Sequence, residues 1–127
     1  MNAAEFAALS GDGAPQAFAK EQQTIIAITG ETDLVTDGRR TFRIANGHPL
    51  MARVTAMGCA ESAVVAAALA VQPDPLMAVG GALLMFGIAG DIAGETANGP
   101  GTFGVHILDA LFNLDPATIL ARAKVSS

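Results

Sequence analysis

Hydrophobic and polar positions follow several distinct periods along the chain, and each period predicts a different element. Phe6 and Leu9 lie at helical spacing within residues 1–10, which predicts a short amphipathic helix at the start. Residues 11–13, Gly-Asp-Gly, end that pattern, and a second helix is expected from Pro15 to about Gln22. The first fifth of the chain is therefore expected to be helical.

The next segment has the pattern of a sheet. Thr24–Ile28 is an unbroken, mostly β-branched run, which predicts a strand buried on both faces, as in a parallel sheet. Leu34-Val35 and Thr41–Ile44 flank the pair Asp37-Gly38, and this arrangement is typical of a β-hairpin. We expect a small, mainly parallel sheet with a hairpin attached.

The second half of the chain has helical periods. The segment up to Thr55 is expected to stay extended, and the pattern then changes to runs of Ala, Val, Leu and Gly. Helices packed on a small sheet indicate an α/β layer protein. The expected helices are Cys59–Val71, Leu76 to about Ala93, Thr102–Phe112 and Pro116–Lys124, the last capped by Asp115.

Composition limits the possible functions. With 127 residues, 51% hydrophobic and 15% charged, the chain can form one domain over residues 1–127 with a core of its own. A net charge of −5 argues against nucleic acid and anionic membranes as partners. The apolar run 75–90 is shorter than the roughly 20 residues of a spanning helix. A single cysteine excludes an internal disulfide, and we expect a reducing, cytoplasmic setting.

That cysteine lies in the most informative local pattern. Gly58-Cys59 stands where a polar, extended stretch turns into a small-residue helix. A helix start carries unpaired N–H groups and positive dipole, so it can hold an anion. Two interpretations remain open at this point. Cys59 is either a small buried residue at a tight turn or a functional thiol that faces an anion.

Other polar residues have structural and functional interpretations as well. Asn2 and Glu5 share one face of the first helical turn, where helix capping is the ordinary role. Glu31, Asp33 and Asp37 follow the first strand, as solvated turn carboxylates or as ligand contacts. The histidines lack partners at zinc-ligand spacing. Residues 99–104 match a dinucleotide-binding pattern, but no strand precedes them, and we expect a turn between helices.

The chain contains four informative segments, Ile28–Asp33, Asn46–Met51, Val54–Cys59 and Gly99–Phe103. Together they resemble the hydroxyethylthiazole kinase family in order and spacing. An Asn-x-x-Glu motif at Asn2–Glu5 is similar to the one that this family shares with ribokinase-like kinases. The resemblance runs along nearly the whole chain and covers about the C-terminal half of the family's length.

The resemblance implies a partial ribokinase-like fold and an enzyme that phosphorylates the hydroxyl of 4-methyl-5-(2-hydroxyethyl)thiazole, for thiamine biosynthesis or salvage. ATP and Mg²⁺ are the implied cofactors, and a homo-oligomer, a trimer in the family, is the implied assembly. Residue by residue, it implies that Cys59 is catalytic and that Ala56 and Gly58 bind substrate. Thr29 and Asn2 would contact ATP, and Glu5 would hold the metal.

Two departures from the family pattern affect the proposed anion site. The family's Gly-x-Gly-Cys reads Ala56-Met57-Gly58-Cys59 here, and Glu61 stands where the family is usually apolar. If the first position needs a glycine conformation, alanine there costs on the order of 1–3 kcal/mol. Because only half of the family's length is matched, two alternatives to a kinase stay open. They are a non-catalytic half-domain that binds nucleotide or self-associates, and an inactive truncated remnant.

Overall fold

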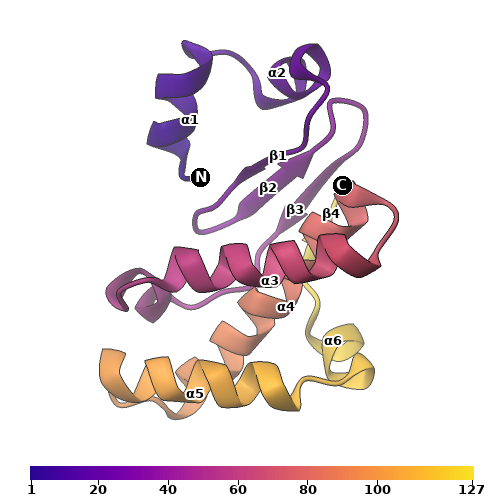
Figure 1. Cartoon of the computed structure of the whole chain (residues 1–127). Helices are drawn as coiled ribbons and strands as arrows, with labels where there is room; N and C mark the ends of the chain where they lie inside the picture. Colours follow the sequence, from indigo (N-terminus) through magenta and orange to yellow (C-terminus); the bar gives the residue numbers. More distant parts are fainter.

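Two short helices, a small sheet and a group of longer helices form three layers in the computed structural model, which describes residues 1–127 (Figure 1). The N-terminal helices lie on one side of the sheet and the longer helices on the other. In chain order the elements are α1 (Ala3–Ser10), α2 (Pro15–Gln22), β1 (Ile26–Ile28), β2 (Asp33–Thr36), β3 (Thr41–Ile44), the 3-10 helix η1 (Pro49–Arg53), α3 (Met57–Val71), α4 (Pro75–Thr96), α5 (Pro100–Asn113), α6 (Pro116–Arg122) and β4 (Val125–Ser126).

Local sequence explains where the helices begin. Pro15, Pro75, Pro100 and Pro116 each open a helix, at the position where a missing N–H costs nothing. Asp115 caps α6 as predicted, with its carboxylate accepting a hydrogen bond from Thr118 N at 2.7 Å. The dinucleotide-like pattern at residues 99–104 follows a helix and not a strand, as predicted, but only Gly99 belongs to the turn after α4, because residues 100–104 form the start of α5.

The predicted hairpin is confirmed. Gly38 has φ +84°, and a Cβ on it would lie 2.7 Å from the backbone N of Lys20 in α2. Both the backbone conformation and the lack of space for a side chain therefore require glycine at this turn. Asp37 accepts hydrogen bonds from the backbone N–H groups of Arg40 and Arg39, which lower its pKa to about 2. Arg40 also binds Asp74 at 2.7 Å, and this ion pair ties the turn to the start of α4.

The strands form one sheet in the order β1-β2-β3-β4, and every neighbouring pair is antiparallel. The α/β layer fold is therefore as expected, but the expectation of a mainly parallel sheet is wrong for the strands of this chain. A β-branched run reports burial on both faces and not strand direction. Only residues 29–32 join β1 to β2, and so short a connection permits only an antiparallel pair.

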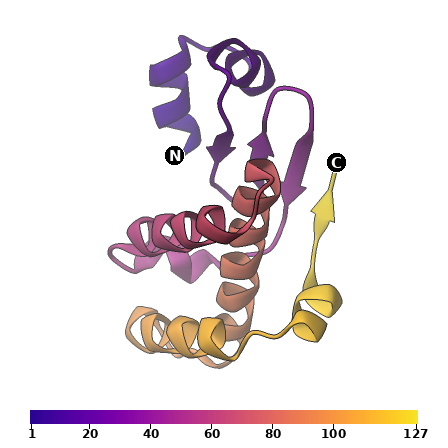
Figure 2. The same cartoon turned by 45° about the vertical axis from the view of Figure 1, so that its right-hand side comes forward.

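Helices bury both faces of the sheet, which explains the unbroken apolar run. On one face, Val35 and Ile44 pack with Leu76, Val79 and Leu83 of α4. On the other face, Ile26 packs with Phe6 of α1 and Ala19 of α2. The sheet is thus the middle layer of three, and Figure 2 shows α1 and α2 above and to the left of it, with α4 running down below the strands.

α4 is the central helix of the molecule. It is long and apolar enough to cross a membrane by length and composition, but 67% of its most apolar window is buried within this fold, as in a core helix. Its first half covers the sheet, and its second half joins α5. Phe86, Ala89 and Ala93 of α4 form a second core cluster there with Phe103, Ile107 and Ala110 of α5.

Two parts of the secondary structure differ from the prediction. The segment expected to remain extended to Thr55 contains the 3-10 helix η1, capped by His48, whose Nδ1 accepts a hydrogen bond from Leu50 N at 3.2 Å. The final helix ends at Arg122, and residues 125–126 form the unpredicted strand β4 against β3. The strand β4 depends on a long-range contact with β3 that a local period does not report, whereas η1 begins at a local cap.

Candidate functional site

The start of α3 has the geometry of an anion site. Ala56 precedes the helix with φ 65° and ψ 15°, a left-handed conformation, and no side chain caps the helix. Ala60 N donates to Ala56 O at 3.0 Å, so the N–H groups of residues 57–59 precede the first helical hydrogen bond. Three donors and the helix dipole therefore converge at one point.

Cys59 lies in this first turn and is an exposed, free thiol. The interpretation of Cys59 as a small buried residue is therefore wrong. Gly58 is also exposed, with no atom within 4 Å of the place where a side chain would begin. The functional interpretation of Cys59 stays a hypothesis, and the open surface around it leaves room for a ligand.

Ala56 stands where the family pattern has glycine, and it adopts a left-handed conformation that favours glycine. In the folded state, a left-handed conformation is about 1 kcal/mol less favourable for alanine than for glycine. The greater conformational entropy of glycine in the unfolded state offsets part of this difference. Ala56→Gly should therefore raise the free energy of unfolding by about 0.5–1 kcal/mol, measured by urea denaturation. Ala63→Gly, an exposed position inside α3, is the control and should lower it by about 1 kcal/mol. Equal effects of the two substitutions would contradict the left-handed strain.

Asn2, Glu5 and Thr29 are brought together at a second place. Asn2 Oδ1 accepts from Glu5 N at 2.9 Å, and Glu5 Oε2 accepts from Asn2 N at 2.8 Å, which completes a capping box. Thr29 lies at the end of β1, where its N–H donates to Met1 O at 2.8 Å and a parallel bridge joins it to Asn2. The ordinary capping role of Asn2 and Glu5 is confirmed. Both side chains remain exposed.

The turn between β1 and β2 connects the cluster of Asn2, Glu5 and Thr29 with the region at the start of α3. Asp33 accepts a hydrogen bond from Gly30 N at 2.9 Å, directly after Thr29, and is only 7% exposed. Asp33 is thus not the solvated turn carboxylate that the sequence suggested as its simpler role. It faces the α3–α4 side of the sheet, because it pairs with Ile44 and lies two residues from Val35. In both views the amino terminus lies over the N-terminal half of α3 (Figures 1 and 2).

Glu61, one turn into α3, interacts electrostatically with Asp33. Burial, and to a smaller extent the nearby Asp33 carboxylate, together raise the pKa of Glu61 to about 7. Burial also raises the pKa of Asp33, and the hydrogen bond from Gly30 N–H lowers it by a smaller amount. Glu61 is therefore about half neutral near pH 7, which weakens the repulsion that its charge would exert on an anion at the start of α3.

This shift predicts a pH dependence of stability. An acid whose pKa is higher in the folded state destabilises the fold as the pH rises between the two pKa values, here from 4.5 to about 7. Glu61→Gln should leave stability at pH 4.5 nearly unchanged and raise it at pH 8 by about 1–2 kcal/mol, allowing for partial exposure. Urea titrations at both pH values measure this, and an equal effect of Glu61→Gln at both would contradict it. Asp33→Asn removes the neighbouring negative charge, so it should move the loss of stability caused by ionisation of Glu61 to lower pH.

The segment between β3 and α3 is held by a buried polar network. Asn46, 5% exposed, donates from Nδ2 to Asp91 Oδ2 at 2.8 Å and to Arg122 O at 2.9 Å, and its Oδ1 accepts from Lys124 N at 2.8 Å. Gly47 N donates to the other Asp91 oxygen at 3.1 Å. This network fixes the path of the chain towards Cys59.

A row of glycines on α4 lets this segment approach closely. A Cβ on Gly87 would lie 2.7 Å from Asn46 O, and one on Gly94 would lie 2.2 Å from Cδ2 of His48. His48 stacks on Phe103 of α5, with ring centroids 5.6 Å apart. His48 is therefore a packed residue between α4 and α5. Its place in the Asn46–Met51 motif has a structural explanation.

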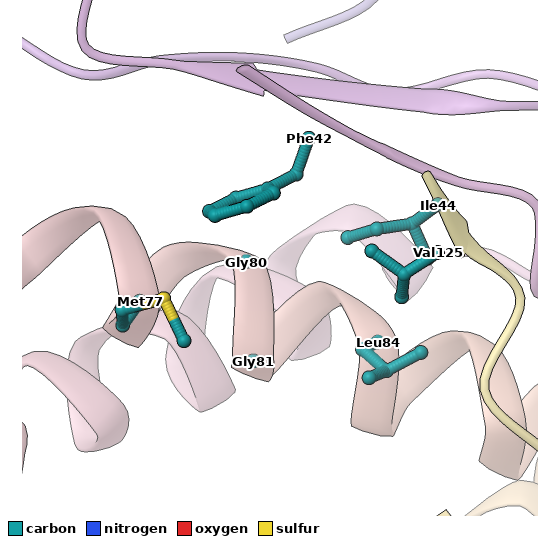
Figure 3. Close-up of a pocket in the computed structure, with 7 residues that line it drawn as sticks. All are labelled: Phe42, Ile44, Met77, Gly80, Gly81, Leu84 and Val125. Atoms are coloured by element: carbon teal, nitrogen blue, oxygen red, sulfur yellow. The ribbon is translucent and has the colours of Figure 1, made fainter. Parts of the chain in front are cut away.

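An apolar cavity lies away from these candidate residues. It has a volume of about 130 Å³ between the β3–β4 edge and α4, and Figure 3 shows its side chains converging from both sides. None of the candidate residues lines it, and its lining is nearly all apolar, so it lacks the polar groups that orient a substrate. The lining residues are Phe42, Ile44, Met77, Gly80, Gly81, Leu84 and Val125.

The sequence of residues 4–117 matches the model of the hydroxyethylthiazole kinase family. The chain belongs to the hydroxyethylthiazole kinase family. It is 58% identical over 108 residues to the hydroxyethylthiazole kinase of Desulfotalea psychrophila, covering 85% of this chain and 40% of that protein. It is 46% identical over 118 residues to that of Cereibacter sphaeroides, covering 93% of this chain and 45% of that protein.

The fold agrees with the family. The structure superposes with a TM-score of 0.84 on the hydroxyethylthiazole kinase protein from Pyrococcus horikoshii OT3, with 44% identity over 88% of this chain and 44% of that one. The ribokinase-like layer fold implied by the resemblance is thereby confirmed. The chain spans 40–45% of the length of these relatives, so the activity of a whole family member is a proposal for this chain.

The family motifs thus have two kinds of structural role in this chain. Thr29, Ala56 and Cys59 end or begin elements around one surface, whereas Asn46 and His48 hold the segment that leads to it. Sequence reasoning missed Asp91, the partner of Asn46, because only the fold brings them together. It had noted Glu61 as a charge and could not show that Asp33 faces it.

Proposed function

We propose that this chain carries one half of a hydroxyethylthiazole kinase site, for ATP-dependent phosphorylation of the hydroxyl of 4-methyl-5-(2-hydroxyethyl)thiazole. The observation that supports this most is the uncapped start of α3, where an exposed Cys59 lies among backbone donors. Membership of the family supports the choice of substrate. Residues 1–127 act in this proposal as one domain, which corresponds to the C-terminal half of a family member.

The residues of α3 act on the phosphoryl group and the alcohol. The N–H groups of Met57, Gly58 and Cys59 stabilise negative charge on the phosphoryl group, since phosphoryl transfer depends mainly on alignment and neutralisation of charge. The backbone at Ala56 and Gly58 contacts the alcohol. Cys59 lies beside its hydroxyl, where the sulfur accepts a hydrogen bond or the proton that the hydroxyl loses.

The residues at the end of β1 act on the nucleotide. Thr29 and Asn2 contact ATP, and one oxygen of Glu5 remains outside the capping box. The chain has no group of three or more His, Cys, Asp or Glu residues that could form a metal cage. Glu5 alone fits Mg²⁺, because this ion keeps most of its waters and binds phosphate oxygens. Bound there, Mg²⁺ would neutralise phosphate charge.

An association role is the second candidate, and the surface of α5 favours it. Val105, Leu108 and Phe112 repeat at helical spacing and are 60%, 62% and 89% exposed. A soluble chain that exposes such a stripe tends to self-associate, in line with the homo-oligomer that the family resemblance implies. A half-domain of this kind could bind nucleotide without turnover.

A direct assay separates the kinase from a half-domain that binds nucleotide without turnover. The purified chain is incubated with ATP, Mg²⁺ and hydroxyethylthiazole, and the phosphate ester is measured by mass spectrometry, with thiazole omitted as the blank. Product above the blank supports the kinase. Calorimetric ATP binding without product supports the non-catalytic half-domain. A chain that neither binds ATP nor forms product would contradict both.

A further inference from the structure

The apolar cavity between α4 and the strands β3 and β4 is formed where α4 lacks side chains. Phe42 and Ile44 lie two residues apart on β3, so both point from the same face of the sheet towards α4. The lining residues of α4 have the spacing i, i+3, i+4 and i+7, which places them on one face of the helix. They are Met77, Gly80, Gly81 and Leu84. Figure 3 shows the Phe42 ring over Gly80, where the helix has no side chain to meet it.

Close packing does not explain the two glycines in this lining. A Cβ on Gly87 or Gly90 would lie 2.7 Å from an atom of Asn46 or Met51, so those positions need glycine. A Cβ on Gly81 would meet nothing within 4 Å, and one on Gly80 would make an ordinary contact with Phe42 at 3.7 Å. Glycine is unfavourable inside a helix, and neither residue has a positive φ that would require it. What the two glycines provide is open space beside Phe42.

The cavity has the size of one six-membered ring. Its volume is about 130 Å³, and all seven lining residues are apolar or glycine. An apolar protein cavity of roughly 150 Å³ lined by Leu, Ile and Phe stays dry and takes up benzene. Met77 and Val125 are 49% and 47% exposed, so the lining reaches the surface and a ligand can enter from solvent. A small apolar molecule would restore the contacts that the empty space lacks.

The lining residues also specify the chemistry of this ligand. An aromatic ring would make an offset or edge-to-face contact with the Phe42 ring, and the Met77 thioether would contact the edge of the same ring. No lining side chain can bind a charge or a hydroxyl group, and burying such a group without a partner is costly. The lining therefore favours an uncharged aromatic ring and excludes phosphates.

We propose that this cavity is a binding site for an uncharged aromatic ring of about the size of benzene. It is separate from the candidate kinase site, because none of the candidate residues lines it. The proposal goes beyond the kinase reaction and does not depend on turnover.

Binding of benzene to the purified chain tests the proposal. The chain is labelled with ¹³C at its methyl groups and titrated with benzene, and the methyl signals are followed by NMR. We expect saturable shifts of the methyl signals of Ile44, Leu84 and Val125, which line the cavity. The unfolding midpoint should rise with benzene concentration, because the ligand binds only the folded chain. Cyclohexane, which has no π system, should bind several times more weakly.

Filling the cavity from α4 should remove the site. Gly80→Leu places a side chain beside Phe42 and should weaken benzene binding at least about tenfold. Ala66→Leu adds the same side chain at an exposed position of α3 and is the matched control, with unchanged affinity expected. If Gly80→Leu does not fold, Gly80→Ala is the smaller variant, and it should also weaken binding.

Four results would overturn the proposal. They are the absence of saturable shifts, shifts confined to methyl groups outside the lining, equal affinity of the filled variant and the parent chain, and cyclohexane binding as tight as that of benzene. The last result would show an apolar cavity without preference for an aromatic ring.

Discussion

Gly87→Ala should destabilise the protein by about 3 kcal/mol, measured as a lower midpoint in urea or thermal denaturation. The added Cβ would lie 2.7 Å from Asn46 O and 2.9 Å from its carbonyl carbon. Both atoms belong to the backbone, so no side-chain rotation relieves the contact. Asn46 is in turn fixed by hydrogen bonds to Asp91, Arg122 and Lys124, and moving it breaks that network.

Gly81→Ala is the matched control on the same helix. A Cβ at Gly81 would meet nothing within 4 Å, so alanine should stabilise α4 by up to about 1 kcal/mol through its helix propensity. The two substitutions are chemically identical and should have opposite signs. If Gly87→Ala were also neutral or stabilising, the close approach of residues 46–51 to α4 would be wrong.

The close approach at Gly87 also affects the candidate site. The segment from Asn46 runs through η1 directly into Ala56 and the start of α3. Val54 and Met57 pack against the cluster that joins α4 and α5. The glycines of α4 therefore determine how closely the segment that leads to Cys59 packs on the core. A site on rigid elements depends on such support away from the reacting atoms.

Local chemistry made much of the fold predictable. Asp37-Gly38 predicted the hairpin because only glycine tolerates the turn, and proline residues marked the starts of α2, α4, α5 and α6. The β-branched run of β1 predicted burial on both faces, which helices provide. It could not predict strand direction, because burial is the same for either direction.

The parts that could not be predicted depend on contacts distant in sequence. β4 is two exposed residues, positioned where Lys124 N meets Asn46 Oδ1 and Ala45 N meets Lys124 O. The burial of Asp33 and the raised pKa of Glu61 arise only when α3 crosses near the sheet. The strain at Ala56 was foreseen conditionally, from a missing glycine, and the structure shows the left-handed φ.

These observations also change how the charge at Glu61 is understood. From sequence, it was a fixed negative charge beside an anion site. In the fold, the pKa of Glu61 is about 7, and the charge that affects it most is the Asp33 carboxylate. An anion at the start of α3 would meet a carboxyl group that takes up a proton more readily than an exposed glutamate does. Anion binding at this surface is expected to strengthen below pH 7.

Cys59→Ala should lower the rate of thiazole phosphorylation at least about a hundredfold, if Cys59 accepts the hydroxyl proton as proposed. The rate is measured on this chain with ATP, Mg²⁺ and hydroxyethylthiazole. Because the thiol is exposed, the same substitution should leave the unfolding midpoint nearly unchanged. A large loss of rate without loss of stability separates a chemical role from a packing role.

Ser62→Ala is the control for this substitution, since Ser62 lies in the same helix and is also exposed. Its hydroxyl only bonds back to Gly58 O at 2.8 Å, so its removal should change the rate little. Cys59→Ser keeps a hydrogen-bonding group of similar size and should retain more activity than Cys59→Ala. If alanine and serine at position 59 both kept the parent rate, the backbone donors of α3 would suffice, and the sulfur would have no part in the reaction.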